Sequence, residues 1–455
     1  MRRKKPSLLT VGVCLLATLI LYVWFHYTFR PVDKKETGMT MFNQVTSKAT
    51  EFKEITIFNQ VSTQETQLKE RTELDISSWF NDKYNTCDGN FIAYGHEFIV
   101  LKNVRFLYKN YSELFAIPCV NFDSKPYFFI SGTEGTPMTK WMLGITQRND
   151  LVEETKLEYT IAFKRIEAHN IYHTLTEWFN VFLLSKHFKF DAKQVDIIFI
   201  DDRPPGAMDE TWHTLYRRVY YAKNLPESTV FKTLILSPIG YESPLRLPYL
   251  KKVEEIEEFS NYFLQAFGIN ERKKLNCARL RVVIIWRHDY NSHPERAEAG
   301  GTVFRKIQNE VEVLQQLKDS LPGHEIIDIL LENISMKQQL QLIAHTDVLI
   351  GMHGAGNAHA LFLPSHAVLL ELFPLNSPQV IFQYFKSVCH WRKLTYVYWQ
   401  NNDKNNDRPN YYTYVPPKVI NTYIKRLCKK LCSPNPNPPK KSLKRNKHQF
   451  NKSIP

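Results

Sequence analysis

The sequence predicts an α/β protein built on parallel sheets. Short apolar runs rich in β-branched and aromatic residues alternate along the chain with longer segments whose apolar residues recur at helical spacing. The 455 residues, 43% of them hydrophobic, suffice for roughly two to three domains with cores of their own. Because strands that are separated by helices pair in parallel, this alternation indicates doubly wound sheets with helices on both faces.

The first 30 residues predict a membrane anchor. Basic residues at positions 2–5 precede an uncharged run of 24 residues, 6–29, and a helix needs about 20 residues to span a bilayer. Positive charge before the span predicts a cytoplasmic N-terminus and a lumenal body. We therefore expect a cytoplasmic tail at 1–7 and a signal anchor at 8–29. A cleaved signal peptide is the alternative, but no small-x-small cleavage site follows the run.

Polar segments flank the predicted globular body. Residues 30–76 contain two near-copies of one pattern, FNQVTSKATEFKE and FNQVSTQETQLKE, which start sixteen residues apart. Two copies are too few for a solenoid, so we interpret 30–76 as a stem. Residues 436–455 are rich in Pro and Lys and are predicted to be a disordered basic tail.

The net charge of +13 is concentrated at the two ends of the chain. Four basic residues lie at positions 2–5. Twelve more lie between Arg408 and Pro455, where no Asp or Glu occurs. The positive charge of these two ends exceeds the net charge of the whole chain by three. The body is therefore near neutral, and the basic end is expected to be solvated. A lumenal tail would not meet nucleic acid, so we expect no nucleic-acid partner.

Cysteines and glycosylation sequons fit a lumenal body. Six cysteines follow Cys14, which lies in the predicted span. An oxidising compartment permits up to three disulfides among these six, and their spacing leaves the pairing open. Asn110, Asn333 and Asn451 begin N-x-S sequons, which accept a glycan only in that compartment.

The first half of the body, 77–270, is expected to form an N-terminal domain. Its predicted strands lie at 127–132, 159–163, 195–202 and 231–238. A helix is predicted at 170–188, where apolar residues recur on one face, and another at 254–268, which ends at Gly268.

The second half, 271–435, is expected to form a C-terminal domain after the polar stretch FGINERKKLN. Helices are predicted at 309–319 and 334–346, the latter opening with a capping box made by Ser335 and Gln338. The predicted strands lie at 280–287, 324–332, 347–356, 367–374 and 394–400.

The stretch GMHGAGNAHALFLP, residues 351–364, stands between two of these strands. Glycine costs backbone entropy and adds no side chain to the core, so three glycines here indicate that another group approaches the backbone closely. In doubly wound sheets, ligands bind beyond the carboxyl ends of strands, often at a helix N-terminus. We expect NAHALFLP to open a helix whose free N–H groups face a phosphate or a ribose. Tight packing alone is the alternative.

Four motifs, in this order, resemble those of glycosyltransferase family 61. They are an N-x-x-H-x-x-x-E helix, an R…R…NE element, the HGA…LFLP…ELFP signature and a final YVYWQN. The last motif resembles the animal branch that extends protein O-mannose with N-acetylglucosamine. The EGF-domain N-acetylglucosaminyltransferase and plant xylosyl- and arabinosyltransferases are more distant members. The motif residues are Asn170, His173, Glu177, Arg287, Arg305, Asn309, Glu310, His353 and Glu371.

The resemblance implies a GT-B fold, in which two Rossmann-like domains face a cleft and the C-terminal one holds the nucleotide sugar. It also implies transfer with inversion. The implied donor is a UDP-sugar, and N-acetylglucosamine is the sugar that the resemblance favours.

Two arginines are the candidates for binding the donor diphosphate. Arg305 offers forked donors to phosphate oxygens, and enzymes of this fold often neutralise the leaving group without a metal. Arg287 ends a predicted strand and is placed for the same cleft. Asn309 and Glu310 would cap the following helix or touch the nucleotide. A surface arginine at a helix start is the alternative for Arg305.

The glycine-rich stretch supplies the other candidates for nucleotide-sugar binding. His353 would donate to a phosphate or to the leaving oxygen, and Gly354, Ala355 and Gly356 would offer backbone N–H groups. Glu371 would accept from ribose hydroxyls, and a buried salt bridge is its structural alternative.

An inverting transfer needs a general base that takes the proton of the acceptor hydroxyl. His173 and Glu177 are four residues apart and therefore share one helix face. Either would be the base, or Glu177 would orient His173; a role in folding is the alternative for both.

Metal dependence is not expected. Asp201 and Asp202 are adjacent after a predicted strand and do not form the Asp-x-Asp that holds a metal-bound diphosphate in other glycosyltransferases. No cofactor is required on this view, although the sequence leaves the use of a divalent metal open. Two features depart from the family pattern. The connection between Arg287 and Arg305 is long, and Asn357-Ala358 replaces the usual Leu-Thr.

The sequence thus predicts a single-pass type II enzyme of the endoplasmic reticulum or Golgi membrane. It would transfer a sugar from a UDP-sugar to a hydroxyl of a glycoprotein or glycan. A non-catalytic lumenal scaffold or glycan-binding protein that retains the fold is the alternative.

Overall fold

The structure is a computed structural model of the chain, and most of its second compact unit, Thr72–Pro455, is described. The described residues are 79–80, 83–94, 98–110, 113–119, 145–147, 155–201, 203–226, 229–237, 240, 243–271, 274–290 and 301–433. The predicted tail at 1–7, anchor at 8–29, stem at 30–76, strand at 127–132 and basic tail at 436–455 lie outside these ranges. Of the helices within them, none combines the length and the apolar character that a membrane span requires.

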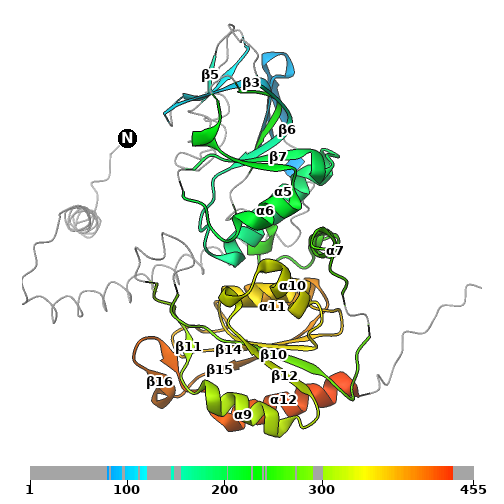
Figure 1. Ribbon diagram of the computed structural model, residues 1–455, viewed down its shortest axis with the longest axis vertical. Coiled ribbons are helices and arrows are strands. Elements are labelled where there is room, and N and C mark those ends of the chain that lie inside the picture. The colour runs from blue at the N-terminus through cyan, green and yellow to red at the C-terminus, as the bar shows by residue number, and fades with distance from the viewer. Residues whose placement is uncertain are drawn as a thin grey trace, which may run out of the picture. The chain divides into compact units, whose positions relative to one another are not determined.

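The first half of the described chain builds a nine-stranded mixed sheet (Figure 1). The order is β1-β2-β3-β9-β6-β7-β8, and β4 and β5 extend from β3. Strands β6 to β9 pair in parallel with one another, but β1–β2, β2–β3 and β3–β9 are antiparallel. The prediction of a purely parallel sheet is therefore wrong for this half, because the chain before β6 adds hairpin strands. The strands are β1 (Lys83–Thr86), β2 (Phe91–Tyr94), β3 (Phe98–Asn110), β4 (Glu113–Ile117), β5 (Ile145–Gln147), β6 (Thr155–Phe163), β7 (Val195–Phe199), β8 (Arg218–Tyr221) and β9 (Thr229–Leu236).

Helix α5 (Ile171–His187) is the central helix of this half and is buried around most of its circumference. The sequence predicts one apolar face. The helix is buried more widely because α7 (Ile256–Ala266) packs on it, with Phe259 against Phe179 and Phe182. A short helix, α6 (Asp209–Leu215), adds Trp212 to the same core.

The second half builds a five-stranded sheet in the order β12-β10-β13-β14-β15, and every pair in it is parallel. Its strands are β10 (Arg281–Ile285), β12 (Glu325–Ile329), β13 (Val348–Met352), β14 (Val368–Phe373) and β15 (Thr395–Gln400). All five were predicted, and the doubly wound arrangement is confirmed for this half.

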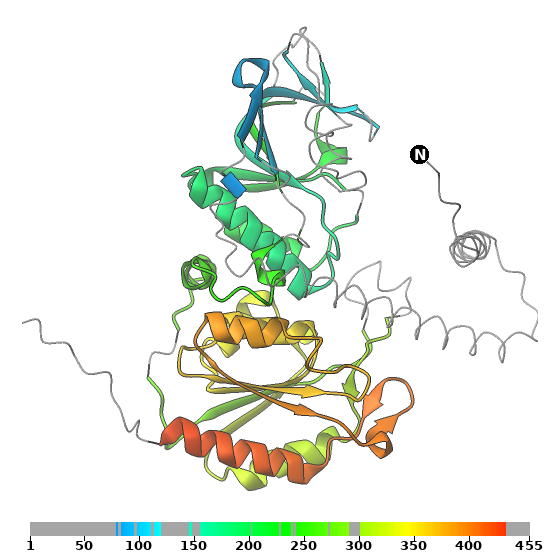
Figure 2. The ribbon, with the colours of Figure 1, turned by 180° about the vertical axis from the view of Figure 1, so that it is seen from behind.

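Helices cover both faces of the second sheet (Figures 1 and 2). Val282 and Ile284 of β10 pack with α9 (Glu310–Ser320) and α12 (Pro417–Cys432), whereas Val283 and Ile285 join the core of α10 (Met336–Ile343) and α11 (Tyr384–Trp391). The predicted capping box at Ser335 and Gln338 is present. The segment after Gly354 is a 3-10 helix, Ala355–Phe362, rather than an α-helix that begins at Asn357.

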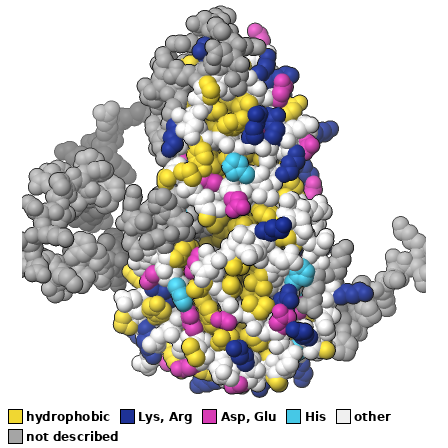
Figure 3. Space-filling model, in the orientation of Figure 1, with side chains coloured by type: hydrophobic (Ala, Val, Ile, Leu, Met, Phe, Trp, Pro, Cys, Tyr) yellow, Lys and Arg dark blue, Asp and Glu magenta, His cyan; other side chains and the backbone are white. Residues whose placement is uncertain are grey.

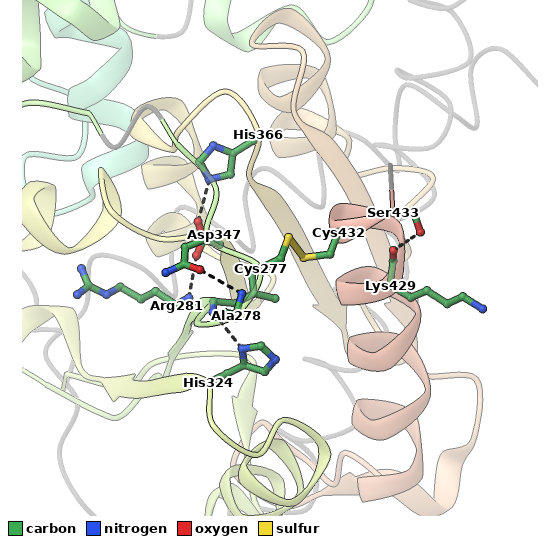
Figure 4. The surroundings of a disulfide bond; sticks show 11 residues. Cys277, Ala278, Arg281, His324, Asp347, His366, Lys429, Cys432 and Ser433 are labelled. Atoms are coloured by element: carbon green, nitrogen blue, oxygen red, sulfur yellow. Dashed lines mark hydrogen bonds and ion pairs between the residues drawn. A yellow bond between two sulfur atoms is a disulfide. The ribbon is translucent and has the colours of Figure 1, made fainter. Parts of the chain in front are cut away.

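Helix α12 is among the elements that the sequence analysis missed, as are α6 and α11; for α12 only the basic charge was considered. Its apolar residues Ile420, Ile424 and Leu427 recur at helical spacing and are buried beside α9. Its lysines lie on the solvent side. A disulfide between Cys277 and Cys432 ties the last turn of α12 to the segment before β10 (Figure 4).

Three short strands form a separate small sheet in the order β11-β17-β16. They are β11 (Lys306–Ile307), β16 (Asp407–Arg408) and β17 (Tyr412–Thr413). A second disulfide joins Cys87 to Cys119, and Cys389 and Cys428 are unpaired. Basic and acidic side chains are interspersed on the face shown in Figure 3, as expected for a near-neutral body.

Hydrogen bonds connect the two halves of the described chain. Trp391 Nε1 of α11 donates to the carbonyl of Leu250 at 2.7 Å, and Ser260 Oγ of α7 donates to that of Leu361 at 2.9 Å. Phe263 of α7 also packs on Phe362. These contacts bring α5 and α7 of the first half next to the 3-10 helix and α11 of the second.

Candidate functional site

His353 follows the carboxyl end of β13, which stops at Met352. Its backbone N–H donates to Leu372 at 2.7 Å, and its ring stacks on Phe373. The Nδ1–H donates to Glu371 Oε1 at 2.7 Å. This bond leaves Nε2 as the nitrogen that is available to a ligand. Burial lowers the pKa of His353, and the hydrogen bond and charge of Glu371 oppose that shift.

Glu371 lies on β14 and is fully buried. Besides His353, it accepts from the hydroxyl of Tyr396 at 2.7 Å and from Asn357 Nδ2 at 3.4 Å. Burial and the neighbouring carboxylate raise the pKa of Tyr396. Glu371 thus accepts hydrogen bonds from three donors within the core. One of these donors is the imidazole of His353, so Glu371 orients that ring.

Arg305 lies close to His353. Its Nε donates to the His353 carbonyl at 2.8 Å. Neither terminal nitrogen of Arg305 has a partner among the described residues. The backbone of Arg305 is left-handed, with φ of 63°. A long side chain rarely adopts this conformation, which is typical of residues held for function.

Arg287 follows β10 and contacts the loop that carries Arg305. Its Nε and Nη2 donate to the carbonyl of Phe304 at 3.2 and 3.1 Å. A Cβ built on Gly354 would lie 2.0 Å from Arg287 Nη1. A side chain at position 354 would therefore displace the guanidinium, which explains why glycine is needed there. Gly356 is different, because a Cβ there would make ordinary 3.5 Å contacts with Ile285 and Leu331.

Asn309 and Glu310 have other partners. Asn309 exchanges two hydrogen bonds of 2.9 Å with the backbone of Val415 and makes no side-chain cap for α9. The expected capping role is thus replaced by a tie between α9 and the segment before α12. Glu310 contacts His288 Nε2 at 3.0 Å, and both line a hollow of about 320 Å³ at the start of α9. Burial raises the pKa of Glu310.

The start of α5 carries the two candidate bases. Asn170 caps the helix by accepting from the Tyr172 N–H at 3.1 Å. His173 Nε2 faces Glu167 Oε1 at 3.3 Å rather than Glu177. Burial lowers the pKa of His173 to about 4, and Glu167 opposes that shift.

Glu177 is withdrawn from the surface. It is 2% exposed, and its Oε1 accepts from the Ile166 N–H at 2.9 Å. Burial raises its pKa to about 8. His173 and Glu177 share a helix face as predicted, but Glu177 makes no hydrogen bond to His173, so it does not orient the imidazole.

Aromatic contacts connect the two groups of candidate residues. The ring of Phe385 on α11 lies 5.6 Å from that of His353 and 5.5 Å from that of Tyr172. Tyr172 adjoins His173, and the two rings are 5.5 Å apart. The start of α5 and the exit of β13 therefore meet along one aromatic seam, Tyr172–Tyr384–Phe385, in which Tyr384 lies 5.5 Å from Tyr172.

The family model described as Glycosyltransferase 61 matches residues 169–370. Those residues are a glycosyltransferase family 61 domain. The matched range contains every candidate residue described above except Glu371, which directly follows it. The resemblance inferred from the four sequence motifs is confirmed.

Curated proteins similar to this chain include two plant enzymes and one animal enzyme. The beta-1,2-xylosyltransferase RCN11 of Oryza sativa subsp. japonica is 27% identical over 52% of this chain and 48% of its own length. The beta-1,2-xylosyltransferase of Arabidopsis thaliana is 28% identical over 54% of this chain and 53% of its own. The EGF domain-specific O-linked N-acetylglucosamine transferase of Rattus norvegicus is 25% identical over 60% of this chain and 52% of its own. The chain thus spans about half the length of these relatives.

Sequence analysis missed three polar residues at or near this candidate site. Tyr396 bonds Glu371, Glu167 faces His173, and the buried Arg165 forms ion pairs with Asp201 and Asp209. The pairing of Asp201 gives that residue a structural partner. Arg165 follows β6 directly, and its position at a strand exit is the signal that could have identified it.

The departure from the family pattern at Asn357 has a structural counterpart. Its amide donates to the Met352 carbonyl at 3.3 Å as well as to Glu371. A Cβ on Gly351 would lie 2.3 Å from Asn357 Oδ1, so Gly351 makes room for this amide. The long connection before Arg305 lies mostly at 291–300, outside the described residues. Within the described ranges, no cluster of three His, Cys, Asp or Glu side chains is placed to hold a metal, and metal independence stays a prediction.

Proposed function

We propose that the chain is an inverting glycosyltransferase of the GT-B type. It transfers a sugar, N-acetylglucosamine in our proposal, from a UDP-sugar to a hydroxyl of a glycoprotein or glycan acceptor. The two sheets would form its two domains, with the acceptor side at 77–270 and the donor side at 271–435.

The conformation of Arg305 is the observation that carries this proposal. The left-handed backbone and the bond to His353 hold a guanidinium whose terminal nitrogens make no hydrogen bond to a described residue. Burial lowers the pKa of Arg305 and the charge of Glu371 opposes the shift, but an arginine stays protonated in proteins. A buried cation beside the exit of β13, whose terminal nitrogens bond no described residue, suits an anionic ligand.

The chemistry follows from what leaves the sugar. When the anomeric carbon–oxygen bond breaks, negative charge develops on the diphosphate. Arg305 and Arg287 would stabilise that charge, and the Gly354, Ala355 and Gly356 backbone would lie against the phosphates or ribose. His353 Nε2 would donate to the diphosphate when the imidazole is protonated.

The relatives support transfer of a sugar and differ in the sugar that they name. Two are xylosyltransferases and one is an N-acetylglucosamine transferase. We favour N-acetylglucosamine because the YVYWQN segment, 396–401, resembles the branch that uses it. Xylose is the second donor to test.

A lumenal location at the endoplasmic reticulum or Golgi membrane, with the anchor at 8–29, belongs to the same proposal. The sequon at Asn333 is exposed on the surface, where a glycan would fit. Asn110 ends β3, and its side chain lies outside the described residues.

UDP release by the full-length chain tests the proposal. The purified protein in detergent is given UDP-N-acetylglucosamine, UDP-xylose or another UDP-sugar, and products are identified by mass spectrometry. Arg305→Ala should lower turnover by about 100-fold or more, since it removes a donor to the developing charge. Equal background release by both proteins with every donor would favour the scaffold alternative.

A further inference from the structure

We infer that the carboxylate of Glu167 accepts the proton of the acceptor hydroxyl, with His173 and Asn170 as its positioning residues. This inference rests on the proposed glycosyl transfer and names the base for it. Glu167 lies outside the motifs that identified the family, and only the tertiary contacts single it out.

Two side chains of the described residues contact the Glu167 carboxylate. His173 Nε2 lies 3.3 Å from Oε1, and Asn170 Nδ2 donates to Oε2 at 3.0 Å. The backbone N–H of Asn170 also donates to the Glu167 carbonyl at 2.8 Å, which closes a tight turn. These contacts fix the orientation of the carboxylate, and 35% of the Glu167 side chain is exposed to solvent, from which a substrate hydroxyl can approach it.

Two buried carboxylates bind the backbone of the segment that carries Glu167. The N–H of Arg165 donates to Asp201 at 2.8 Å, and the N–H of Ile166 donates to Glu177 at 2.9 Å. This segment follows β6, whose partners on both sides are parallel strands. Glu167 thus stands at the carboxyl end of a parallel strand, where ligands of such sheets bind.

Exposure separates Glu167 from the two bases that the sequence suggested. The side chain of Glu167 is 35% exposed, whereas that of His173 is 14% exposed. The Nε2 of His173 faces Glu167 and its Nδ1 is buried, so the ring presents no nitrogen to a substrate. Glu177 is 2% exposed and cannot reach one either.

A chain of ring contacts links His173, the partner of Glu167, to the donor residue His353. His173 adjoins Tyr172, whose ring meets Phe385, and Phe385 meets His353. The charged and titratable groups around His173, besides Glu167, are Arg246 and His169. The base therefore comes from the segment before α5. Of the cations, Arg287 follows β10, and Arg305 is bonded to His353 after β13.

One bond to the anomeric carbon forms and one breaks in the proposed transfer. The acceptor O–H gives its proton to a Glu167 oxygen, and the acceptor oxygen uses a lone pair to bond the anomeric carbon from the side opposite the diphosphate. The bond from that carbon to the diphosphate oxygen breaks, and its electron pair leaves with UDP. Arg305 and Arg287 meet the charge that UDP gains.

Glu167→Gln in the full-length chain tests this assignment. The assay measures UDP release from the UDP-sugar that the wild type uses, with p-nitrophenyl α-mannoside as the acceptor probe and water as the reference acceptor. We expect kcat to fall by about 10²–10⁴-fold. The KM for the UDP-sugar and the rise in Tm that UDP causes should not change, and the acidic limb of the pH profile of kcat should disappear.

Glu158→Gln is the matched control, because it removes a carboxylate from an exposed ion pair with Lys232 on β6. Its kcat should equal that of the wild type. Glu167→Asp keeps a carboxylate and should retain more turnover than Glu167→Gln, together with the acidic limb. His173→Asn should lower kcat less than Glu167→Gln does.

Two outcomes would overturn the assignment of Glu167. Turnover of Glu167→Gln within threefold of the wild type would exclude a base at this position, and loss of the UDP-induced rise in Tm would give Glu167 a role in donor binding or folding instead. If the wild type itself released UDP from no donor, the proposed function would fail first, which is a separate result.

Discussion

The guanidinium of Arg287 lies directly against the α-carbon of Gly354, where a Cβ would come within 2.0 Å of Nη1. The same guanidinium donates a hydrogen bond to the carbonyl of Phe304, the residue before Arg305. Arg305 Nε in turn donates to the carbonyl of His353. The loop of Arg287 is thus bonded to that of Arg305, and the loop of Arg305 is bonded to that of His353 and Gly354. A change at one small residue should disturb both cations.

Gly354→Ala should therefore reduce activity much more than stability. The backbone at 354 is extended, so alanine adds no backbone strain, and the displaced group is the end of a flexible side chain. We expect the free energy of unfolding to change by less than about 1 kcal/mol. The value of kcat/KM should fall about 10- to 100-fold because the guanidinium is misplaced. Gly356→Ala, whose Cβ meets only ordinary contacts, should cost less activity, and an equal loss in both variants would contradict this account.

Arg305→Gly and Arg305→Ala should be equally inactive but unequally stable. Both remove the guanidinium, yet only glycine adopts a φ of 63° without steric cost. The left-handed conformation costs other residues about 1–2 kcal/mol, so the glycine variant should unfold at higher urea concentration than the alanine variant. Urea titrations followed by tryptophan fluorescence would measure the difference. An alanine variant as stable as the glycine variant would show that the backbone relaxes when the side chain is lost.

Glu177→Gln should change how stability depends on pH. Burial raises the folded-state pKa of Glu177 from 4.5 to about 8, so the folded chain keeps a proton that the unfolded chain releases between these values. The stability of the wild type should therefore fall as pH rises through this window, relative to a variant that cannot titrate there. Glutamine resembles the protonated form and can still accept from Ile166. The difference in unfolding free energy between variant and wild type should grow in favour of the variant, by on the order of 3 kcal/mol from pH 4.5 to 8. A difference that stays constant with pH would mean that Glu177 titrates normally.

Removal of the Cys277–Cys432 disulfide should loosen α12. The bond closes a loop of 155 residues, and such cross-links contribute about 2–5 kcal/mol. In the double variant with serine at both positions, trypsin should cut after Lys425, Arg426, Lys429 and Lys430 sooner than in the wild type (Figure 4). Cys428→Ser, which removes an unpaired cysteine from the same helix, should leave the cleavage rate unchanged. Equal cleavage rates in the double variant and the wild type would show that packing on α9 alone holds the helix.

The sequence by itself determined the local elements and the family. Short apolar runs located all five strands of the second sheet, and helical spacing located α5, α7, α9 and α10, because these patterns depend on neighbours along the chain. Ser335 and Gln338 marked a helix start for the same reason. The four motifs placed Arg305 and His353 in one functional group, and the fold brings them together.

The tertiary structure alone decided which groups meet. Arg165 lies 36 residues from Asp201, and Tyr396 lies 25 residues from Glu371, so no local pattern indicates either pair. Spacing placed Glu177 on the same helix face as His173, but the loop after β6 binds Glu177 through Ile166 and brings Glu167 to the imidazole instead. Side-chain partners across a fold depend on strand order and on how helices cover each sheet, and these are properties of the whole chain rather than of a window of residues.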